Sequence, residues 1–137
     1  MTEQSPVQTS QFPVTQLWNK ILFVPIVGEM NEKRTKTLME TLLETTRETG
    51  SKVVILDLSG VATMDTEVSK RLMDLGEAVR LMGARYMICG IQPNQTHTLV
   101  NLGIDLANIE THHNLSSALD EALSEVGLEV RSVGDEG

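Results

Sequence analysis

The chain has 137 residues and a formal net charge of −8, and only 3% of its residues are aromatic. This length suits one domain, which buries enough apolar surface to fold without a disulfide or a structural metal. The acidic balance argues against binding to nucleic acid or to anionic membranes, because both depend on Lys and Arg side chains near phosphates. The shortage of aromatic side chains also removes the stacking platforms that bind single-stranded nucleic acid.

Targeting and redox signals are also missing from the sequence. The first twelve residues, MTEQSPVQTSQF, contain neither a basic residue nor the apolar centre of a signal peptide. The longest apolar run, near Ile21–Val27, is too short to span a bilayer. A single cysteine, Cys89, excludes an intrachain disulfide. We therefore expect a soluble cytoplasmic protein.

The first half of the chain predicts a hairpin followed by a helix. Residues 1–12 are polar and are expected to be a disordered N-terminal segment ahead of a domain that covers residues 13–127. Two apolar clusters within Val14–Val27 predict a β-hairpin. The segment Asn31–Gly50 predicts a helix with Asn31 as N-cap and Gly50 just past its end.

Strands and helices then alternate. A short apolar run, Val53–Leu58, predicts a central strand, and apolar residues spaced three and four apart predict a helix over Asp65–Met82. The next strand covers Arg85–Cys89, and Pro93 begins a third helix that ends before Gly103.

The last elements are short. Ile109–Thr111 predicts an edge strand, and Asn114 caps a fourth helix that Gly127 stops. Residues 128–137 are expected to form a flexible acidic tail. The alternation of strands and helices predicts an α/β domain with right-handed crossovers and a largely parallel inner sheet.

The usual catalytic and cofactor motifs do not occur. The sequence contains neither GxGxxG nor GxxxxGK[ST], so it offers no phosphate-binding loop. Cys89 lies in a predicted buried strand and is interpreted as an inert core thiol rather than as a nucleophile paired with His97. His112 and His113 are adjacent and would point to opposite sides of an extended segment, so we predict no metal site. We predict no cofactor and no enzymatic activity.

One hydroxyl has a special place in the predicted fold. Asp65 and Thr66 stand at the start of the second helix, where unpaired N–H groups and the helix dipole favour a phosphate. Asp57 ends the preceding strand, and Ser59 follows it in the turn. In the simpler interpretation, Asp57 is a solvated strand end and Asp65 is an N-cap. In the more specific interpretation, Thr66 is a phosphorylation site with Asp57, Ser59 and Asp65 around it.

Two stretches carry a family resemblance. The runs VVILDLSGVATMDTEVSKRL and EAVRLMGARYMICGIQPNQTHTLVNLGID resemble the STAS domain of stressosome proteins, a family related to anti-sigma factor antagonists. The resemblance covers roughly Pro13–Val126. It implies a STAS fold with a mixed, mostly parallel sheet and four helices packed largely on one side. It also implies that the domain itself performs no catalysis.

The resemblance further implies a mechanism. STAS proteins of this kind bind a serine/threonine switch kinase, and phosphorylation at the start of the second helix, here Thr66, changes which partner is held. A second phosphorylated threonine of the sensor class matches Thr98, which makes the chain similar to a sensor-type C-terminal domain. The family also self-associates into dimers and into large complexes of scaffold and sensor paralogues. We therefore expect release of the kinase upon phosphorylation of Thr66, tuned by Thr98.

Sensor-type proteins carry an N-terminal sensing domain, whereas about a dozen polar residues precede the first predicted strand here. The chain is therefore expected to be a sensor-less paralogue or an isolated domain. Two alternative functions stay open: a stand-alone anti-sigma factor antagonist, and a regulatory domain that binds a small ligand or a nucleotide.

Overall fold

A computed structural model describes residues 12–101, 103 and 109–136 of the protein. One sheet contains the strands β1 (Thr15–Trp18), β2 (Ile21–Val27), β3 (Val53–Gly60), β4 (Arg85–Cys89) and β5 (Glu110–His112). The helices are α2 (Glu32–Thr49), α3 (Thr66–Leu81), α4 (Pro93–Asn101) and α5 (Leu115–Glu125), and a short 3-10 helix, η2, covers Val133–Glu136.

The sheet is mixed, as predicted. The strand order is β1-β2-β3-β4-β5; β1 and β2 form the expected antiparallel hairpin, and every later pair is parallel. Because β2, β3, β4 and β5 run in one direction, their carboxyl ends meet at a single edge of the sheet. The segments that follow β3 and β4 are therefore brought together at that edge.

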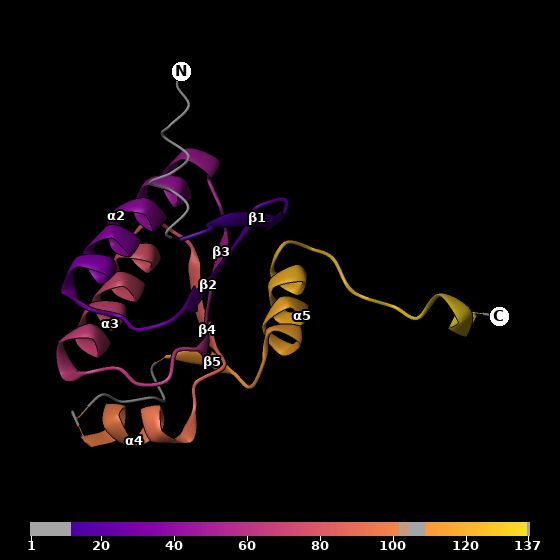
Figure 1. The fold of residues 1–137 in the computed structure, drawn as a ribbon. Helices are drawn as coiled ribbons and strands as arrows, with labels where there is room; N and C mark the ends of the chain where they lie inside the picture. The colour runs from indigo at the N-terminus through magenta and orange to yellow at the C-terminus, as the bar shows by residue number, and fades with distance from the viewer. Residues whose placement is uncertain (1–11, 102, 104–108, 137) are drawn as a thin grey trace.

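Helices cover both faces of this sheet (Figure 1). α2 and α3 lie side by side on one face, α5 packs on the other, and α4 lies beyond the carboxyl ends of the strands. Alternating side chains of β3 explain the two layers: Val54 and Leu56 belong to the α2–α3 core, whereas Val53 and Ile55 pack with Ala118 of α5. The helices are thus less concentrated on one side than we expected from the resemblance.

Local capping residues set the helix boundaries. Side chains of Asn31, Asp65 and Asn114 each accept a hydrogen bond from the backbone N–H three residues later, at 2.8 to 2.9 Å. Gly50 closes α2 in the left-handed conformation, with φ +61°. The predicted starts of α2, α3 and α5 are therefore confirmed, since the sequence carries the caps that determine them.

The structure shifts some predicted boundaries. β3 runs two residues beyond Leu58, and β5 begins one residue later than the predicted strand. Phe12, placed at the end of the predicted disordered segment, is instead buried in the core, and the Arg34 guanidinium lies over its ring. Residues 1–11 lie outside the described part of the chain.

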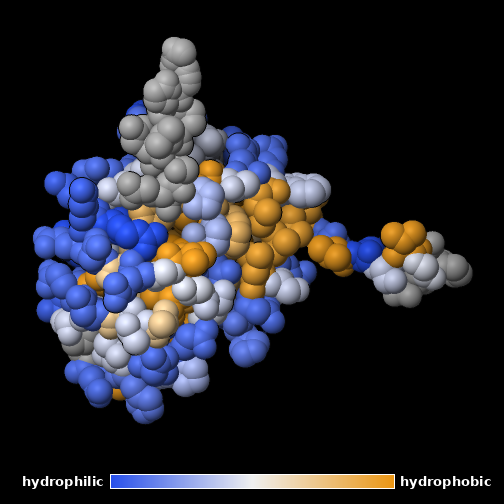
Figure 2. All heavy atoms as spheres, in the orientation of Figure 1, coloured by the Kyte–Doolittle hydropathy of each residue, from blue (hydrophilic) through white to orange (hydrophobic). Residues whose placement is uncertain are grey.

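The C-terminal segment extends away from the domain (Figure 1). Its apolar side chains, Leu128, Val130 and Val133, are exposed, and Figure 2 shows hydrophobic atoms along this arm. Among the helices that the structure describes, none combines the length and the apolar character needed to cross a membrane.

Candidate functional site

Thr66 is the first residue of α3 and is exposed to solvent. The preceding residue, Asp65, is the N-cap: its Oδ1 accepts a hydrogen bond from the Val68 N–H at 2.8 Å, and its carbonyl accepts one from the Ser69 hydroxyl at 3.0 Å. The helix start is therefore held rigidly by Asp65. The Thr66 hydroxyl is presented at the positive end of a sixteen-residue helix.

Asp57 and Ser59 both lie within β3, so Asp57 does not end this strand and Ser59 is not in a turn, as we predicted; the strand continues to Gly60, past a shift in its register with β2. Oδ1 of Asp57 accepts a hydrogen bond from the Ser59 N–H at 2.9 Å. Gly90, which directly follows β4, lies close to these residues, since a β-carbon there would lie 2.7 Å from the same Asp57 oxygen. Asp57 thus shapes the strand end, and Asp65 is the carboxylate next to Thr66 in the chain.

Thr98 lies on α4 and is half-buried. Its hydroxyl donates a hydrogen bond to the Asn94 carbonyl, one turn earlier, at 3.2 Å. Residues Leu99 and Gln95 are the buried positions of this helix. Thr98 is therefore on a different element from Thr66, and both elements begin at the carboxyl edge of the sheet.

Two side chains that the sequence analysis did not select join these elements. Gln95 is only 1% exposed, and its Nε2 donates to the Val61 carbonyl at 2.6 Å. Asn94 Nδ2 donates to the Ala62 carbonyl at 3.1 Å. Both acceptors belong to the segment between β3 and Thr66, so α4 is bonded directly to the loop that precedes the predicted phosphorylation site.

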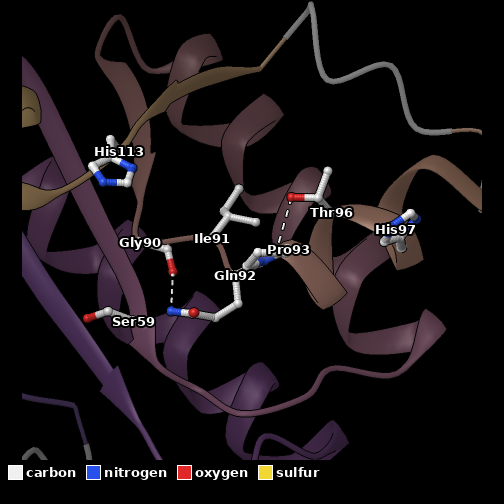
Figure 3. A pocket seen from close by; sticks show the side chains of 8 residues that line it. All are labelled: Ser59, Gly90, Ile91, Gln92, Pro93, Thr96, His97 and His113. Carbon is white, nitrogen blue, oxygen red and sulfur yellow. Dashed lines mark hydrogen bonds between the residues drawn. The ribbon is translucent and has the colours of Figure 1, made fainter.

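A cavity of about 560 Å³ opens beside this junction (Figure 3). Two of its polar side chains bond to backbone carbonyls of the lining: Gln92 Nε2 donates to the Gly90 carbonyl at 3.2 Å, and the Thr96 hydroxyl donates to the Gln92 carbonyl at 3.3 Å. Figure 3 places His97 and His113 at opposite sides of the view. The lining residues are Ser59, Gly90, Ile91, Gln92, Pro93, Thr96, His97 and His113.

Cys89 lies next to Asp57 in the parallel register of β3 and β4 and is fully buried. Burial, with a smaller contribution from the Asp57 carboxylate, raises the pKa of the Cys89 thiol to about 12. The thiol therefore stays protonated at neutral pH and is a poor nucleophile. Within the described ranges, no group of three or more His, Cys, Asp or Glu side chains is arranged to hold a metal ion.

The family model for the STAS domain matches residues 13–122. The chain belongs to the STAS domain family. It is 35% identical to the RsbT co-antagonist protein RsbRA of Bacillus subtilis over 129 residues, which cover 94% of this chain and 47% of that protein. The co-antagonist RsbRB of the same organism is 36% identical over 108 residues, 79% of this chain and 39% of that protein. This STAS chain thus spans about half, or less, of the length of these curated relatives.

Solved STAS structures confirm the fold. A variant of RsbS from Moorella thermoacetica matches with a TM-score of 0.77 and 23% identity, covering 86% of this chain and 99% of that one. A chain from a structure that describes the architecture of the stressosome matches with a TM-score of 0.68 and 22% identity, covering 85% of this chain and 100% of that one. The anti-sigma factor antagonist SpoIIAA in its unphosphorylated form matches with a TM-score of 0.67 and 10% identity, covering 80% of this chain and 94% of that one. The predicted resemblance to STAS proteins of the stressosome type is confirmed by the co-antagonist relatives.

Proposed function

We propose that this STAS domain is a non-catalytic switch that binds a serine/threonine kinase and releases it when Thr66 is phosphorylated. The observation that supports the proposal best is the position of Thr66, an exposed hydroxyl on the first residue of α3, directly after the Asp65 N-cap. Its relatives are named as co-antagonists of RsbT, which agrees with a protein that holds and releases a signalling partner. Such a switch acts in the cytoplasm, where the kinase meets ATP.

Charge explains how phosphorylation would release the partner. A phosphate adds about −1.5 to −2 charge at neutral pH. The helix N-terminus stabilises that charge locally by roughly 0.3–1 kcal/mol. At a docking surface, however, the phosphate would be added beside Asp65 and Glu67 on a chain that already has a net charge of −8. The repulsion then dominates, because a desolvated contact screens charges poorly.

The decisive experiment measures the affinity of the cognate kinase for the unmodified and the phosphorylated domain, with the phosphate mapped by mass spectrometry. Phosphorylation at Thr66 is expected to weaken binding by about tenfold or more. Thr66→Glu is expected to weaken it in the same direction, whereas Thr66→Ala keeps the kinase bound. Thr63→Glu is a matched control, since Thr63 is exposed in the same loop. Equal affinity of the two forms would contradict the proposal.

Thr98 is proposed as a second, tuning phosphorylation site. Its half-buried position on α4 makes it a slower substrate than the exposed Thr66. Thr98→Ala is expected to leave the kinase bound at rest and to change the extent of release under strong stimulation. Unchanged release in that variant would remove Thr98 from the switch.

The last part of the proposal concerns the assembly of this domain with other STAS proteins. We expect the domain to self-associate and to enter large complexes with scaffold and sensor STAS paralogues. Light scattering of the protein with its scaffold partner measures this directly. Particles far larger than a dimer are the expected result. A small complex that contains only this chain and an anti-sigma kinase would instead identify a stand-alone anti-sigma factor antagonist.

A further inference from the structure

We propose that the C-terminal arm of this chain, residues 128–136, packs against a second copy of the domain, on the side of the sheet that α5 covers only in part. The inference rests on the self-association proposed above and assigns a surface to it. It starts from apolar side chains that face water. Of the eight large apolar side chains that are exposed in the described residues, four belong to the arm or to this side of the sheet: Trp18, Leu128, Val130 and Val133.

α5 leaves part of its face of the sheet open. It packs mainly on β3, β4 and β5, and Arg85 at the start of β4 donates to Glu125 on one flank of the helix. Helical spacing places Leu119 and Val126 on the other flank of the buried stripe, toward β2, where both are half-buried in one cluster with Phe23. On this side of the sheet, no helix of the described part of the chain lies over β1 and β2.

Trp18 extends the open surface to the edge of the sheet. It lies opposite Ile21 in the antiparallel register of β1 and β2, and Ile21 belongs to the core under α5. Directly opposite residues of an antiparallel pair share a face, so Trp18 lies on the α5 side, where it is 54% exposed. Figure 2 shows hydrophobic atoms gathered between β1 and α5 and continuing onto the arm. The residues that form this apolar patch are Trp18, Phe23, Leu119 and Val126.

A Schellman motif directs the arm away from the patch of its own chain. The Leu128 N–H donates to the Leu123 carbonyl at 2.8 Å, and the Gly127 N–H donates to the Ser124 carbonyl at 3.0 Å. Gly127 has φ +87°, which sets the direction in which the chain leaves α5. Neither glycine nor proline occurs at positions 128–133, so the sequence provides no turn that would fold the arm back. The arm therefore extends outward (Figure 1).

Two-fold symmetry would bury both exposed surfaces in one interface. The arm begins two residues after Val126 of the patch, so two copies that face each other through their patches bring each arm onto the other domain. Leu128 and Val130 alternate with polar residues, which gives the extended arm one apolar side. The segment before η2 spans roughly 17 Å, the length of a typical strand. It is therefore long enough to cross the patch of a second copy.

Charge also favours a copy of this chain as the partner. The arm ends with two carboxylates, Asp135 and Glu136. The rim of the patch instead carries two exposed lysines: Lys20 follows Trp18 in the β1–β2 turn, and the Lys52 N–H donates to the Lys20 carbonyl. An acidic arm against a basic rim is complementary, which offsets part of the repulsion between two chains of net charge −8.

Sedimentation velocity of the full chain over a concentration series tests this surface. The wild-type chain is expected to dimerise. Val130→Asp combined with Val133→Asp is expected to raise the dimer dissociation constant by about a hundredfold, because each substitution enters the interface twice. Trp18→Ser should weaken the dimer in the same direction. Leu81→Asp is the matched control, since Leu81 is 88% exposed at the end of α3, which covers the other face of the sheet.

Crosslinking identifies which copy each arm covers. Cys89 is buried, so added thiols on the surface react first. Chains with Val130→Cys, mixed with chains that carry Trp18→Cys, are expected to form a heterodimer with a short bismaleimide, whereas a mixture with Leu81→Cys chains is not. With Val130→Cys and Trp18→Cys in one chain, high dilution should yield no internal crosslink, since the arm leads away from its own patch.

The outcomes separate this inference from the function proposed above. A dimer that the Val130/Val133 and Trp18 variants leave unchanged overturns the proposed surface, while self-association itself stands. A crosslink that forms only within one chain shows that the arm covers its own patch and also overturns the inference. A wild-type chain that stays monomeric throughout the series contradicts both this surface and the proposed self-association. The kinase switch at Thr66 is tested by none of these measurements.

Discussion

Gly90 and Asp57 fit together only because Gly90 lacks a β-carbon: that atom would lie 2.7 Å from Oδ1 of Asp57 and 2.8 Å from the Ser59 nitrogen. Gly90 also has φ +77°, which side chains rarely adopt. We expect Gly90→Ala to lower the free energy of unfolding by roughly 2–4 kcal/mol, from strain and overpacking together. Urea denaturation of the wild-type protein and of Gly90→Ala measures this loss.

Gly83 provides the control for that substitution. Its φ is +91°, but a β-carbon there would meet nothing within 4 Å. Gly83→Ala should therefore show the cost of the backbone strain alone, about 1 kcal/mol. An equal loss in the two variants would mean that the contact with Asp57 contributes nothing.

The Asp65 cap should matter for both stability and signalling. Asp65→Ala removes the acceptor for the Val68 N–H, and we expect a loss of about 1 kcal/mol in the free energy of unfolding. Asn114→Ala removes the equivalent cap of α5 and should cost a similar amount. Kinase binding should fall only in Asp65→Ala, because Thr66 follows that cap. A comparable loss of binding in Asn114→Ala would indicate a general folding effect.

The Cys89 thiol should be unreactive in the native protein and should make stability depend on pH. Its pKa rises from 9.0 in the unfolded chain to about 12 in the fold, so the native state holds the proton more tightly. The resulting stabilisation is complete below pH 9 and is lost as the pH rises from 9 to about 12. Urea unfolding midpoints across that pH range, compared with those of Cys89→Ala, measure the pH-dependent contribution of Cys89 to stability.

Alkylation is a second check on Cys89. The native thiol should react with iodoacetamide far more slowly than the same thiol in urea, because the neutral form is a weak nucleophile. A native rate equal to that of the unfolded chain would contradict the buried, protonated state.

Arg85 should help to hold α5 against the sheet. Its guanidinium donates to Glu110 on β5 at 3.2 Å and to Glu125 on α5 at 2.8 Å. Since these groups are partly exposed, we expect Arg85→Met to cost only about 1 kcal/mol, with the loss shrinking at high salt. Arg80→Met is the control: its ion pair with Glu77, at 3.0 Å, stays on one exposed helix face. A salt-independent loss in Arg85→Met would point to packing rather than charge.

Much of this fold could be predicted because local residues determine where its helices begin and end. Asn31, Asp65 and Asn114 carry their capping function in their side chains, and apolar spacing identifies the buried face of each helix. The position of Thr66 at a helix start followed from the same signals. The contact between Gly90 and Asp57 could not be predicted, since it depends on how two strands that are distant in sequence align.

The side of the sheet that each helix covers depends on topology rather than on its own residues. Strands β2, β3 and β4 are added in one direction, and right-handed crossovers then put their connecting helices, α2 and α3, on one face. α5 follows the last strand and connects nothing to the sheet, so this rule does not constrain it. Its stripe of small and apolar residues, which includes Ala118 and Ala122, packs on the opposite face.

Gln95 shows a different limit of sequence reasoning. A glutamine on a short helix ordinarily faces water, so its type gives no sign of burial. The one available signal was its spacing of four residues from the buried Leu99, which puts both on the same helix face. The acceptor, the Val61 carbonyl, lies 34 residues away and is a backbone atom, which no side-chain pattern could reveal.

The amino and carboxyl ends of the parallel strands differ in how much sequence change they can accept. At the amino ends, the Lys52 N–H donates to the Lys20 carbonyl and the Arg85 N–H donates to the Lys52 carbonyl, both at 2.8 Å, which joins the segments where β2, β3 and β4 begin. Insertions there would break the sheet register. At the carboxyl edge the connections carry Thr66 and Thr98 outside the sheet hydrogen bonds. The segments at this edge can therefore change in sequence and length without disturbing the hydrogen bonds of the sheet.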